Sequence, residues 1–299
     1  MALPSKLQRR IFDLGDPGSG PTLVTIGGVH GDEPAGVEAM ERLARHQPEP
    51  AGRMLGLTGN IGALRAGTRY IDVDLNRCWT EDGMAWAAQN PGAAAEHGEL
   101  LELLEILEGA WRARSQEHPF VVLDLHTTSG AGPPFAMLST REDEMAFGRR
   151  LPIVKVLGIE RYVNGALLSF LSAWGAISLG FEGGQHQAPD SVEHHRALMW
   201  VAAVQLGLVE AGIERAWVER LQRACREVPG EIRVVHRHEV RPRDGFTMRP
   251  GHYHLEPIKA GLHLANDGTG AILAPVGGYL LMPSYGPKGE DGFFIGQAV

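Results

Sequence analysis

The sequence has few cysteines, no long apolar run and no excess of positive charge. Cys78 and Cys225 are its two cysteines, too few and too far apart for a disulfide framework, so we expect a reducing, cytoplasmic environment. The most membrane-like stretch, 165–181, is interrupted by serines and glycines and falls short of the roughly 20 apolar residues of a membrane span. The basic N-terminus is not followed by the apolar region of a signal peptide, so export is not indicated.

The charge of the chain argues against two kinds of partner. Its 36 acidic residues outnumber its 28 basic residues, which gives a net charge of −8. Nucleic acids and anionic membranes are bound by a clustered positive face, so neither is expected as the main partner. The composition, 43% hydrophobic in 299 residues, fits one large globular domain or a large and a small one. The oligomeric state stays open, a homo-oligomer included.

Short apolar segments alternate with helical patterns in the first two thirds of the chain. Strands are predicted at 22–26, 53–58, 120–126, 153–157 and 176–181, and helices at 34–43, 100–111 and 191–211. This alternation predicts an α/β fold with a mixed, largely buried sheet flanked by helices. After about residue 223, β-prone runs at 232–235, 270–274 and 278–282 predict a smaller all-β domain, which gives domains 1–222 and 223–299.

A histidine and a carboxylate follow the first predicted strand, three residues apart. His30 and Glu33 converge on one point if the chain turns between them, and His126 lies at the end of another strand. Imidazole and carboxylate groups are usual zinc ligands, and catalytic zinc sites combine three protein ligands with an open position. These three residues therefore predict one Zn²⁺ per chain. Asp124 shares a strand face with His126 and is expected to orient it.

Two further segments contain candidate catalytic groups. The segment from Arg69 to Arg77 is dense in side chains that can hold a carboxylate or a developing oxyanion; a surface loop of Asp–Arg pairs is the alternative. Glu182 lies at the end of an apolar strand, and we expect the two residues after it, Gly183 and Gly184, to be flexible. Burial would raise the pKa of Glu182 and make it a general base, whereas a solvated loop residue is the alternative.

Other candidate groups have simpler interpretations. His236 and His238, and likewise His252 and His254, are two residues apart and would face the same way on a strand, but no third ligand is near them in the sequence. We interpret them as surface or domain-contact histidines. No motif of the sequence pairs Cys78 with a histidine, so we expect Cys78 to be a small buried side chain rather than a nucleophile.

Together these motifs resemble the succinylglutamate desuccinylase/aspartoacylase family, whose fold is similar to that of the zinc carboxypeptidases. The motifs follow the family's order and comparable spacing over most of the first 220 residues, at 28–33, 69–77, 124–128 and 181–182. The resemblance implies that His30, Glu33 and His126 bind zinc. It also implies that Arg69 polarises the scissile carbonyl and that Glu182 is the general base and acid.

The resemblance also implies how a substrate is held. Asn76 and Arg77 would bind a substrate carboxylate, the C-terminal β domain would partly cover the active-site channel, and Tyr285 would touch the substrate. Related aspartoacylases have a further arginine roughly a dozen residues before the catalytic glutamate, but the segment 167–174 contains no cation. The sequence therefore leaves open which acyl group and which amino acid are recognised, and whether a dicarboxylate such as N-acetylaspartate is among the substrates.

The sequence thus predicts a zinc-dependent amidohydrolase that acts on an N-acyl amino acid or a related small carboxylate. A zinc metallocarboxypeptidase that cleaves a C-terminal peptide bond is the nearest alternative. A non-catalytic zinc-binding interaction module is the third, and it is disfavoured because structural zinc sites are usually closed by four ligands.

Overall fold

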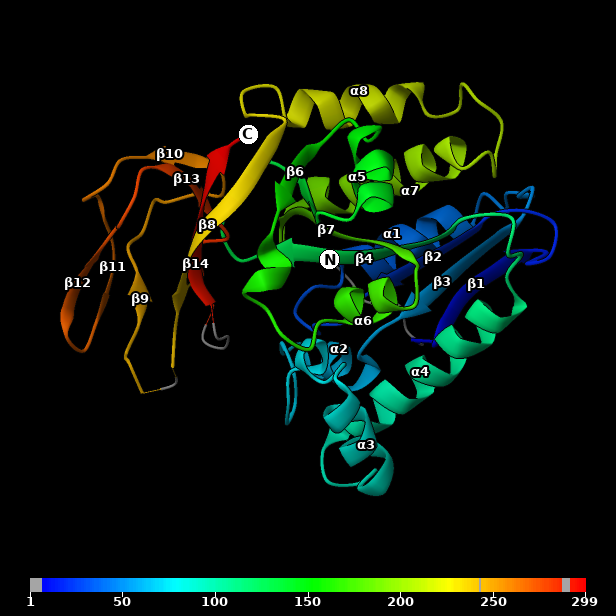
Figure 1. Ribbon diagram of the computed structural model, residues 1–299, viewed down its shortest axis with the longest axis horizontal. Coiled ribbons are helices and arrows are strands. Elements are labelled where there is room, and N and C mark those ends of the chain that lie inside the picture. Colours follow the sequence, from blue (N-terminus) through cyan, green and yellow to red (C-terminus); the bar gives the residue numbers. More distant parts are fainter. Residues whose placement is uncertain (1–6, 242, 287–290) are drawn as a thin grey trace.

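The computed structural model describes residues 7–241, 243–286 and 291–299 and alternates strands and helices through most of the chain (Figure 1). Up to residue 128 the elements are β1 (Arg10–Gly15), β2 (Thr22–Gly27), α1 (Ala35–Ala44), β3 (Arg53–Thr58), α2 (Ile61–Ala66), the 3₁₀ helix η1 (Leu75–Arg77), α3 (Glu81–Gln89), α4 (Ala95–Ala113) and β4 (Phe120–Thr128). From there to residue 224 they are β5 (Phe135–Leu138), α5 (Glu142–Arg149), β6 (Val154–Leu157), the 3₁₀ helix η2 (Ile159–Arg161), α6 (Leu167–Ala173), β7 (Ile177–Gln185), α7 (Pro189–Gln205) and α8 (Arg215–Ala224).

The last part of the chain is all β, as predicted. Its strands are β8 (Glu231–Glu239), β9 (Thr247–Met248), β10 (Glu256–Ile258), β11 (His263–Asp267), β12 (Gly270–Leu273), β13 (Gly278–Leu281) and β14 (Asp291–Ala298). Within the described residues no helix combines the length and the apolar character needed to cross a bilayer.

One mixed sheet joins both parts of the chain. In the described residues it has 11 strands in the order β1-β3-β2-β4-β7-β5-β6-β8-β14-β13-β10, and β12-β11-β9 form a separate small sheet. The strands β3, β2, β4 and β7 are parallel, β5 is antiparallel to β7, and β8 pairs in parallel with β6. The C-terminal strands therefore extend the central sheet. The boundary between domains 1–222 and 223–299 stays a prediction.

Helices cover the two faces of the parallel strands, and Figure 1 shows α1, α7 and α8 on one side and α2, α3 and α4 on the other. Alternate residues of each strand supply the two cores. Leu23 and Leu125 pack with α1 and α7, whereas Val24 and Val122 pack with α4. The predicted α/β class, with a mixed, buried sheet flanked by helices and a smaller sheet near the C-terminus, is confirmed.

Two local predictions are wrong. The helix predicted over 191–211 ends at Gln205, because Gly207 takes a left-handed conformation and its N–H and that of Leu208 bond back to the last turn. Gly183 and Gly184 are buried residues of β7 rather than a flexible exit from it. β1 and the four-residue β5 have no counterpart among the predicted strands.

Candidate active site

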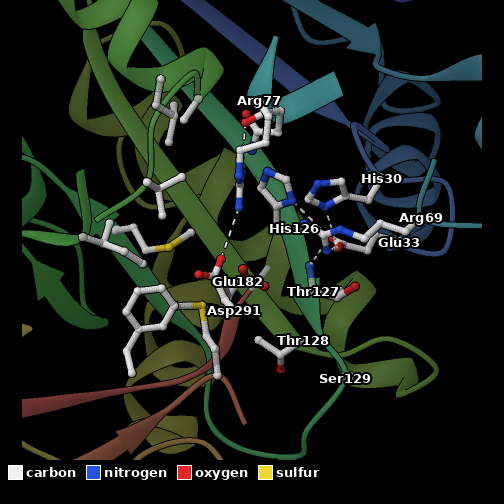
Figure 2. Close-up of a pocket in the computed structure, with 18 of the residues that line it drawn as sticks. His30, Glu33, Arg69, Arg77, His126, Thr127, Thr128, Ser129, Glu182 and Asp291 are labelled. Carbon is white, nitrogen blue, oxygen red and sulfur yellow. Dashed lines mark hydrogen bonds and ion pairs between the residues drawn. The ribbon is translucent and has the colours of Figure 1, made fainter. Parts of the chain in front are cut away.

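The predicted metal ligands meet at the carboxyl ends of β2 and β4. The N–H of Glu33 donates to the carbonyl of His30, and this turn brings Glu33 Oε1 within 2.8 Å of His30 Nδ1. Glu33 Oε2 lies 3.0 Å from His126 Nδ1 and accepts the backbone N–H of Thr127 at 2.8 Å. All three side chains are buried, and one ligand atom from each lies within 4.8 Å of the others (Figure 2). In open α/β sheets, ligands bind in the crevice outside the carboxyl ends of the strands.

Each imidazole is oriented by a carboxylate on its other nitrogen. His126 Nε2 lies 2.8 Å from Asp124 Oδ2, and His30 Nε2 lies 3.2 Å from Asp74 Oδ1. A carboxylate only accepts hydrogen bonds, so the Nε2–H groups donate to these two carboxylates. This is the arrangement that fixes the tautomer of metal-binding histidines. Both Nδ1 atoms face the carboxylate of Glu33 and donate to it as well, with protons that a bound metal would replace. The expected orienting contact of Asp124 is present, and Asp74 supplies the same contact to His30.

The charges of the site shift the pKa values of its members. Burial alone would lower the pKa of His126, but Asp124 and Glu33 raise it well above its usual value. The pKa of His30 is likewise raised, because Glu33 and Asp74 outweigh burial and the charge of Arg69. Burial opposes ionisation of Glu33, yet the two histidines hold its pKa well below its usual value. Glu33 is therefore ionised and able to act as a ligand.

Glu182 stands directly across from His126. The two residues are paired in the parallel register of β4 and β7. Glu182 is 7% exposed, and within the described part of the chain its Oε2 makes no hydrogen bond. Burial, together with the charge of Glu33, raises its pKa to about 8. A carboxyl with a raised pKa and a free oxygen, beside three side chains that can hold a metal, is suited to taking up and releasing protons.

A buried histidine of α7 packs against the strand that bears Glu182 and bonds to the neighbouring strand β4. His195 Nε2 donates to the carbonyl of His126 at 2.9 Å, and burial lowers the pKa of His195 to about 3, so the ring is neutral. A Cβ on Gly183 would lie 2.2 Å from His195 Nε2. Glycine is thus needed at position 183 for this close approach.

The segment between α2 and η1 lies beside the ligand set and contains Arg69. The Nε and Nη2 atoms of Arg69 both donate to Asp74 Oδ2 at 3.1 Å, and Arg69 Nη1 lies 3.8 Å from Glu33 Oε1. Asp74 thereby joins the guanidinium to His30. The pKa of Asp74 is lowered despite its burial, mainly because of His30 and Arg69. Arg69 therefore presents a fixed positive charge at the edge of the site (Figure 2).

A buried glutamate on α4 holds this segment in place. Glu96 is 0% exposed and accepts the backbone N–H groups of Ile71, Asp72 and Val73 at 2.7–3.2 Å, and the side-chain amide of Asn60 at 3.1 Å. These bonds fix the backbone between Arg69 and Asp74. No prediction from the sequence included this role.

Asn76 and Arg77 lie on η1 and line the same cavity. Asn76 Oδ1 accepts the N–H of Leu167, and Arg77 Nη2 pairs with Asp291 Oδ2 at 3.2 Å. Asp291 begins β14 and is also bonded by Arg237. Figure 2 shows Arg77 extending toward Asp291 and Glu182. The C-terminal part of the chain therefore contributes directly to the site.

These groups open onto a cavity of about 560 Å³. Its lining includes His30, Glu33, Arg69, Asn76, Arg77, His126, Glu182 and Asp291, together with apolar side chains of β5, η2, α6 and β14. Residues 282–284 and Gly286 also line it. This volume lies within the range of about 300–1,000 Å³ typical of small-molecule sites.

Tyr285 is placed differently from the other predicted residues. Its neighbours line the cavity, but its hydroxyl donates toward the carbonyls of Arg249 and His252, and its side chain is 40% exposed. In this structure it is not brought to the site, and its contact with substrate stays a prediction.

The rival histidines fit their simpler interpretations, whereas Cys78 is half-buried rather than buried as predicted. His254 is buried, stacks on Phe135 with ring centroids 3.9 Å apart, and accepts the N–H of Met282. His238 stacks on Phe293, and His252 bonds to Glu256. Among the described residues, the only group of three or more His, Cys, Asp or Glu side chains close enough to hold a metal is the His30 group. Burial raises the pKa of Cys78 to about 11, which disfavours a thiolate nucleophile.

The sequence relates this site to known proteins. A model of the succinylglutamate desuccinylase/aspartoacylase catalytic domain matches residues 19–185, more than half of the chain. The chain belongs to this family. The match includes the His30, Glu33, His126 and Glu182 positions, and the predicted family is confirmed.

Other succinylglutamate desuccinylase/aspartoacylase proteins are similar to this chain in sequence, and solved structures are similar to it in fold. A succinylglutamate desuccinylase of Ectopseudomonas mendocina is 31% identical over 149 residues, which are 48% of this chain and 42% of that protein. The chain thus matches less than half the length of this curated relative. A succinylglutamate desuccinylase/aspartoacylase structure from Rhodobacter sphaeroides has a TM-score of 0.69 at 20% identity and covers 96% of this chain and 88% of its own. Murine aminoacylase 3 has a TM-score of 0.63 at 18% identity and covers 94% and 95%.

Proposed function

We propose that this protein is a zinc-dependent amidohydrolase that removes the acyl group from an N-acyl amino acid or a related small carboxylate. The observation that carries the proposal is the convergence of His30, Glu33 and His126 opposite the unpaired Glu182, inside a cavity of small-molecule size. Membership of a family that contains desuccinylases and aspartoacylases supports the same reaction type.

The donor set fits zinc. Two imidazole nitrogens and one carboxylate are ligands that catalytic zinc sites use, and the Nε2 atoms of both rings are already bonded to carboxylates. His30, Glu33 and His126 would hold the ion on the side that faces the cavity. Bound zinc supplies Lewis acidity, which lowers the pKa of water and polarises a carbonyl.

Glu182 moves the proton in the proposed reaction. As a carboxylate it accepts a proton from the attacking water, and as the acid it donates that proton to the leaving amine. In the metal-free site burial raises its pKa to about 8, and the charge of bound zinc would lower this value. A pKa that stays above that of an ordinary carboxyl suits the second step, because an ordinary carboxyl is a poor source of protons at neutral pH. The cavity removes the side chain from bulk water, which strengthens its interactions with the reacting atoms.

Arg69 and the η1 residues bind the charges of the substrate. Arg69, fixed by Asp74, donates to the oxyanion that develops when the carbonyl is attacked. Asn76 and Arg77 bind the carboxylate of the amino acid, for which the planar guanidinium is suited. Binding of the carboxylate requires Arg77 to share or exchange its contact with Asp291.

The alternatives have less support. Residues of β14 and the segment 282–286 help to enclose the cavity, whereas a carboxypeptidase needs an open groove for the peptide. A non-catalytic zinc module does not need Glu182 unpaired in a cavity beside three ligands. Cytoplasmic location stays a prediction.

Metal analysis combined with hydrolysis assays tests the proposal. We expect one zinc per chain, and hydrolysis of N-acyl amino acids in preference to short peptides. Glu182→Gln is expected to keep zinc but to lose about 10²–10⁴-fold in kcat, since it removes the general base. Glu219→Gln, the same exchange on the exposed face of α8, is the matched control and should behave like the wild type. A wild-type protein that binds no metal, or a Glu182→Gln variant with full activity, would contradict the proposal.

A further inference from the structure

One wall of the cavity is apolar. Its side chains come from four separate segments, namely β5, the stretch from η2 to α6, the residue after β13, and β14. They are Met137, Ile159, Val163, Leu168, Met282 and Phe294. We call these six residues the apolar wall. Such a surface gains free energy when a substrate group displaces its water, and it offers no hydrogen bond to a charged group.

The apolar wall begins next to the proposed general base. Met137 on β5 is paired with Gly180 on β7, two residues before Glu182 and on the same strand face. The tips of Met137 and Leu168 meet over Gly180, where an added Cβ would lie 2.8 Å and 3.0 Å from them. Two residues along a strand span about 7 Å. A group attached to the atoms that react beside Glu182 therefore reaches the wall directly.

The wall also lies near the proposed carboxylate-binding residues, which line the same cavity. The N–H of Leu167, which precedes Leu168 of the wall, donates to Asn76 Oδ1. Phe294 follows Asp291 on β14, and Asp291 is the ion-pair partner of Arg77. If the α-carboxylate of a substrate lies at Asn76 and Arg77, the side chain on the same carbon lies against the wall.

The charges of the cavity disfavour a second carboxylate. Among the described residues of its lining, the permanent cations are Arg69 and Arg77, and each is bonded to a carboxylate. The lining also contains the carboxylates of Glu160 and Asp32, besides those already placed at the site. An acidic side chain of the substrate would lose its hydration and lie near like charges.

We infer that the substrate is the N-acyl derivative of an amino acid with a bulky apolar side chain, which the apolar wall binds. The inference rests on the proposed function, because it places the α-carboxylate at Asn76 and Arg77. The wall holds the side chain of the leaving amino acid, and the acyl group lies on the opposite side of the scissile bond. A neutral side chain needs no ionic partner beyond the apolar contact.

A substrate panel on the zinc-loaded protein tests the inference. We expect kcat/KM for N-acetyl-L-phenylalanine and N-acetyl-L-leucine to exceed that for N-acetyl-L-aspartate and Nα-acetyl-L-lysine by at least about tenfold. A preference for the aspartate or lysine derivative would overturn the inference and leave the proposed deacylase function standing. N-octanoyl-L-aspartate is the fifth probe, and if it is the best substrate the wall holds the acyl group, which also overturns the inference.

Substitutions in the wall locate the effect. Leu168→Arg places a cation in the wall on a half-buried helical position, and it should shift the preference by at least about tenfold toward N-acetyl-L-aspartate. Ala173→Arg adds the same residue to an exposed position of α6 outside the cavity and should leave the preference unchanged. Leu168→Ala, the milder change, should raise KM for the phenylalanine derivative more than for the aspartate derivative. Unchanged preferences in both Leu168 variants would refute the role of the wall.

Binding separates failure of this inference from failure of the proposed function. Calorimetry on the zinc-loaded Glu182→Gln variant should detect N-acetyl-L-phenylalanine more tightly bound than N-acetyl-L-aspartate. If no N-acyl amino acid is hydrolysed but this order of binding is found, the proposed reaction is wrong and the apolar recognition holds. If the aspartate derivative binds at least as tightly, the apolar recognition is wrong whatever the activity.

Discussion

Replacing Asp74 by asparagine tests how the proposed metal ligands are connected to Arg69. In the structure Oδ1 of Asp74 faces His30 Nε2 and accepts the N–H of Asn76, whereas Oδ2 accepts both N–H groups of Arg69. An asparagine has one acceptor oxygen and one donor amide at these two places. Whichever way the amide is turned, its NH2 group faces N–H donors, either those of Arg69 or those of His30 and Asn76.

The size of the effect follows from the bonds lost. Hydrogen bonds to a charged group contribute about 1.5–3 kcal/mol each, and loss of a carboxylate that orients a metal-bound histidine typically weakens metal binding by about 10–100-fold. We therefore expect the zinc dissociation constant of Asp74→Asn to rise by about 10–100-fold, which is about 1.4–2.8 kcal/mol. At saturating zinc kcat should also fall, because Arg69 is no longer held beside Glu33.

Competition with a chromophoric chelator measures the first quantity, and steady-state hydrolysis at saturating zinc measures the second. Asp72→Asn is the matched control, since Asp72 lies on the same segment, is exposed and bonds to the backbone of Ala95. If Asp74→Asn keeps both zinc affinity and kcat within about twofold of the wild type, the connecting role of Asp74 is refuted.

Three further predictions concern the surroundings of the site. Glu96→Gln should lower the melting temperature and raise KM, because the backbone of 71–73 loses a charged acceptor; unchanged values in calorimetry and kinetics would contradict this. Zinc affinity should rise as the pH rises above the ordinary histidine pKa, since the histidines of the ligand set have raised pKa values and must lose a proton to bind; calorimetry in two buffers should detect proton release, and a flat profile would disprove it. Gly183→Ala should destabilise the protein by at least about 1 kcal/mol in denaturant unfolding, because its Cβ meets His195. Gly98→Ala, in α4 with open space around it, should be neutral or stabilising by up to about 1 kcal/mol, and equal effects of the two changes would rule out this explanation.

The ligand set could be predicted from the sequence because its geometry is local. His30 and Glu33 are joined by a single turn, and His126 lies at the end of an apolar strand whose direction is set by its parallel neighbours. The carboxyl ends of parallel strands meet at one edge of a sheet, so two short motifs are enough to place these three side chains together.

The rest of the site depends on long-range pairing. Asp291 reaches Arg77 only because β14 pairs with β8, and β8 with β6, and the sequence does not contain that order of strands. Met137 lies on a strand of four residues that runs against its neighbour, too short to have a clear period. The apolar wall was therefore outside the reach of sequence patterns.

The partners of single buried polar residues were equally hard to predict. Glu96 lies four residues before Leu100, on the face of α4 that also carries Leu103, so the helical period separates it from the exposed Glu102 and Glu105. The period does not show that the segment 71–73 packs over Glu96 and donates its N–H groups to it. Glu182 lies inside β7 because His195 packs on the glycine that follows, a contact with a separate helix.

The continuation of the central sheet into β14 also sets the order in which the site can be assembled during synthesis. The three candidate ligands are present once residue 126 has been made, but Asp291 and Phe294 follow about 165 residues later. At about 5–20 residues per second, the ribosome needs roughly 8–33 s for that interval. Metal ions can reach the ligand residues throughout this time, whereas the wall that selects the substrate is completed only after the last strand has joined the sheet.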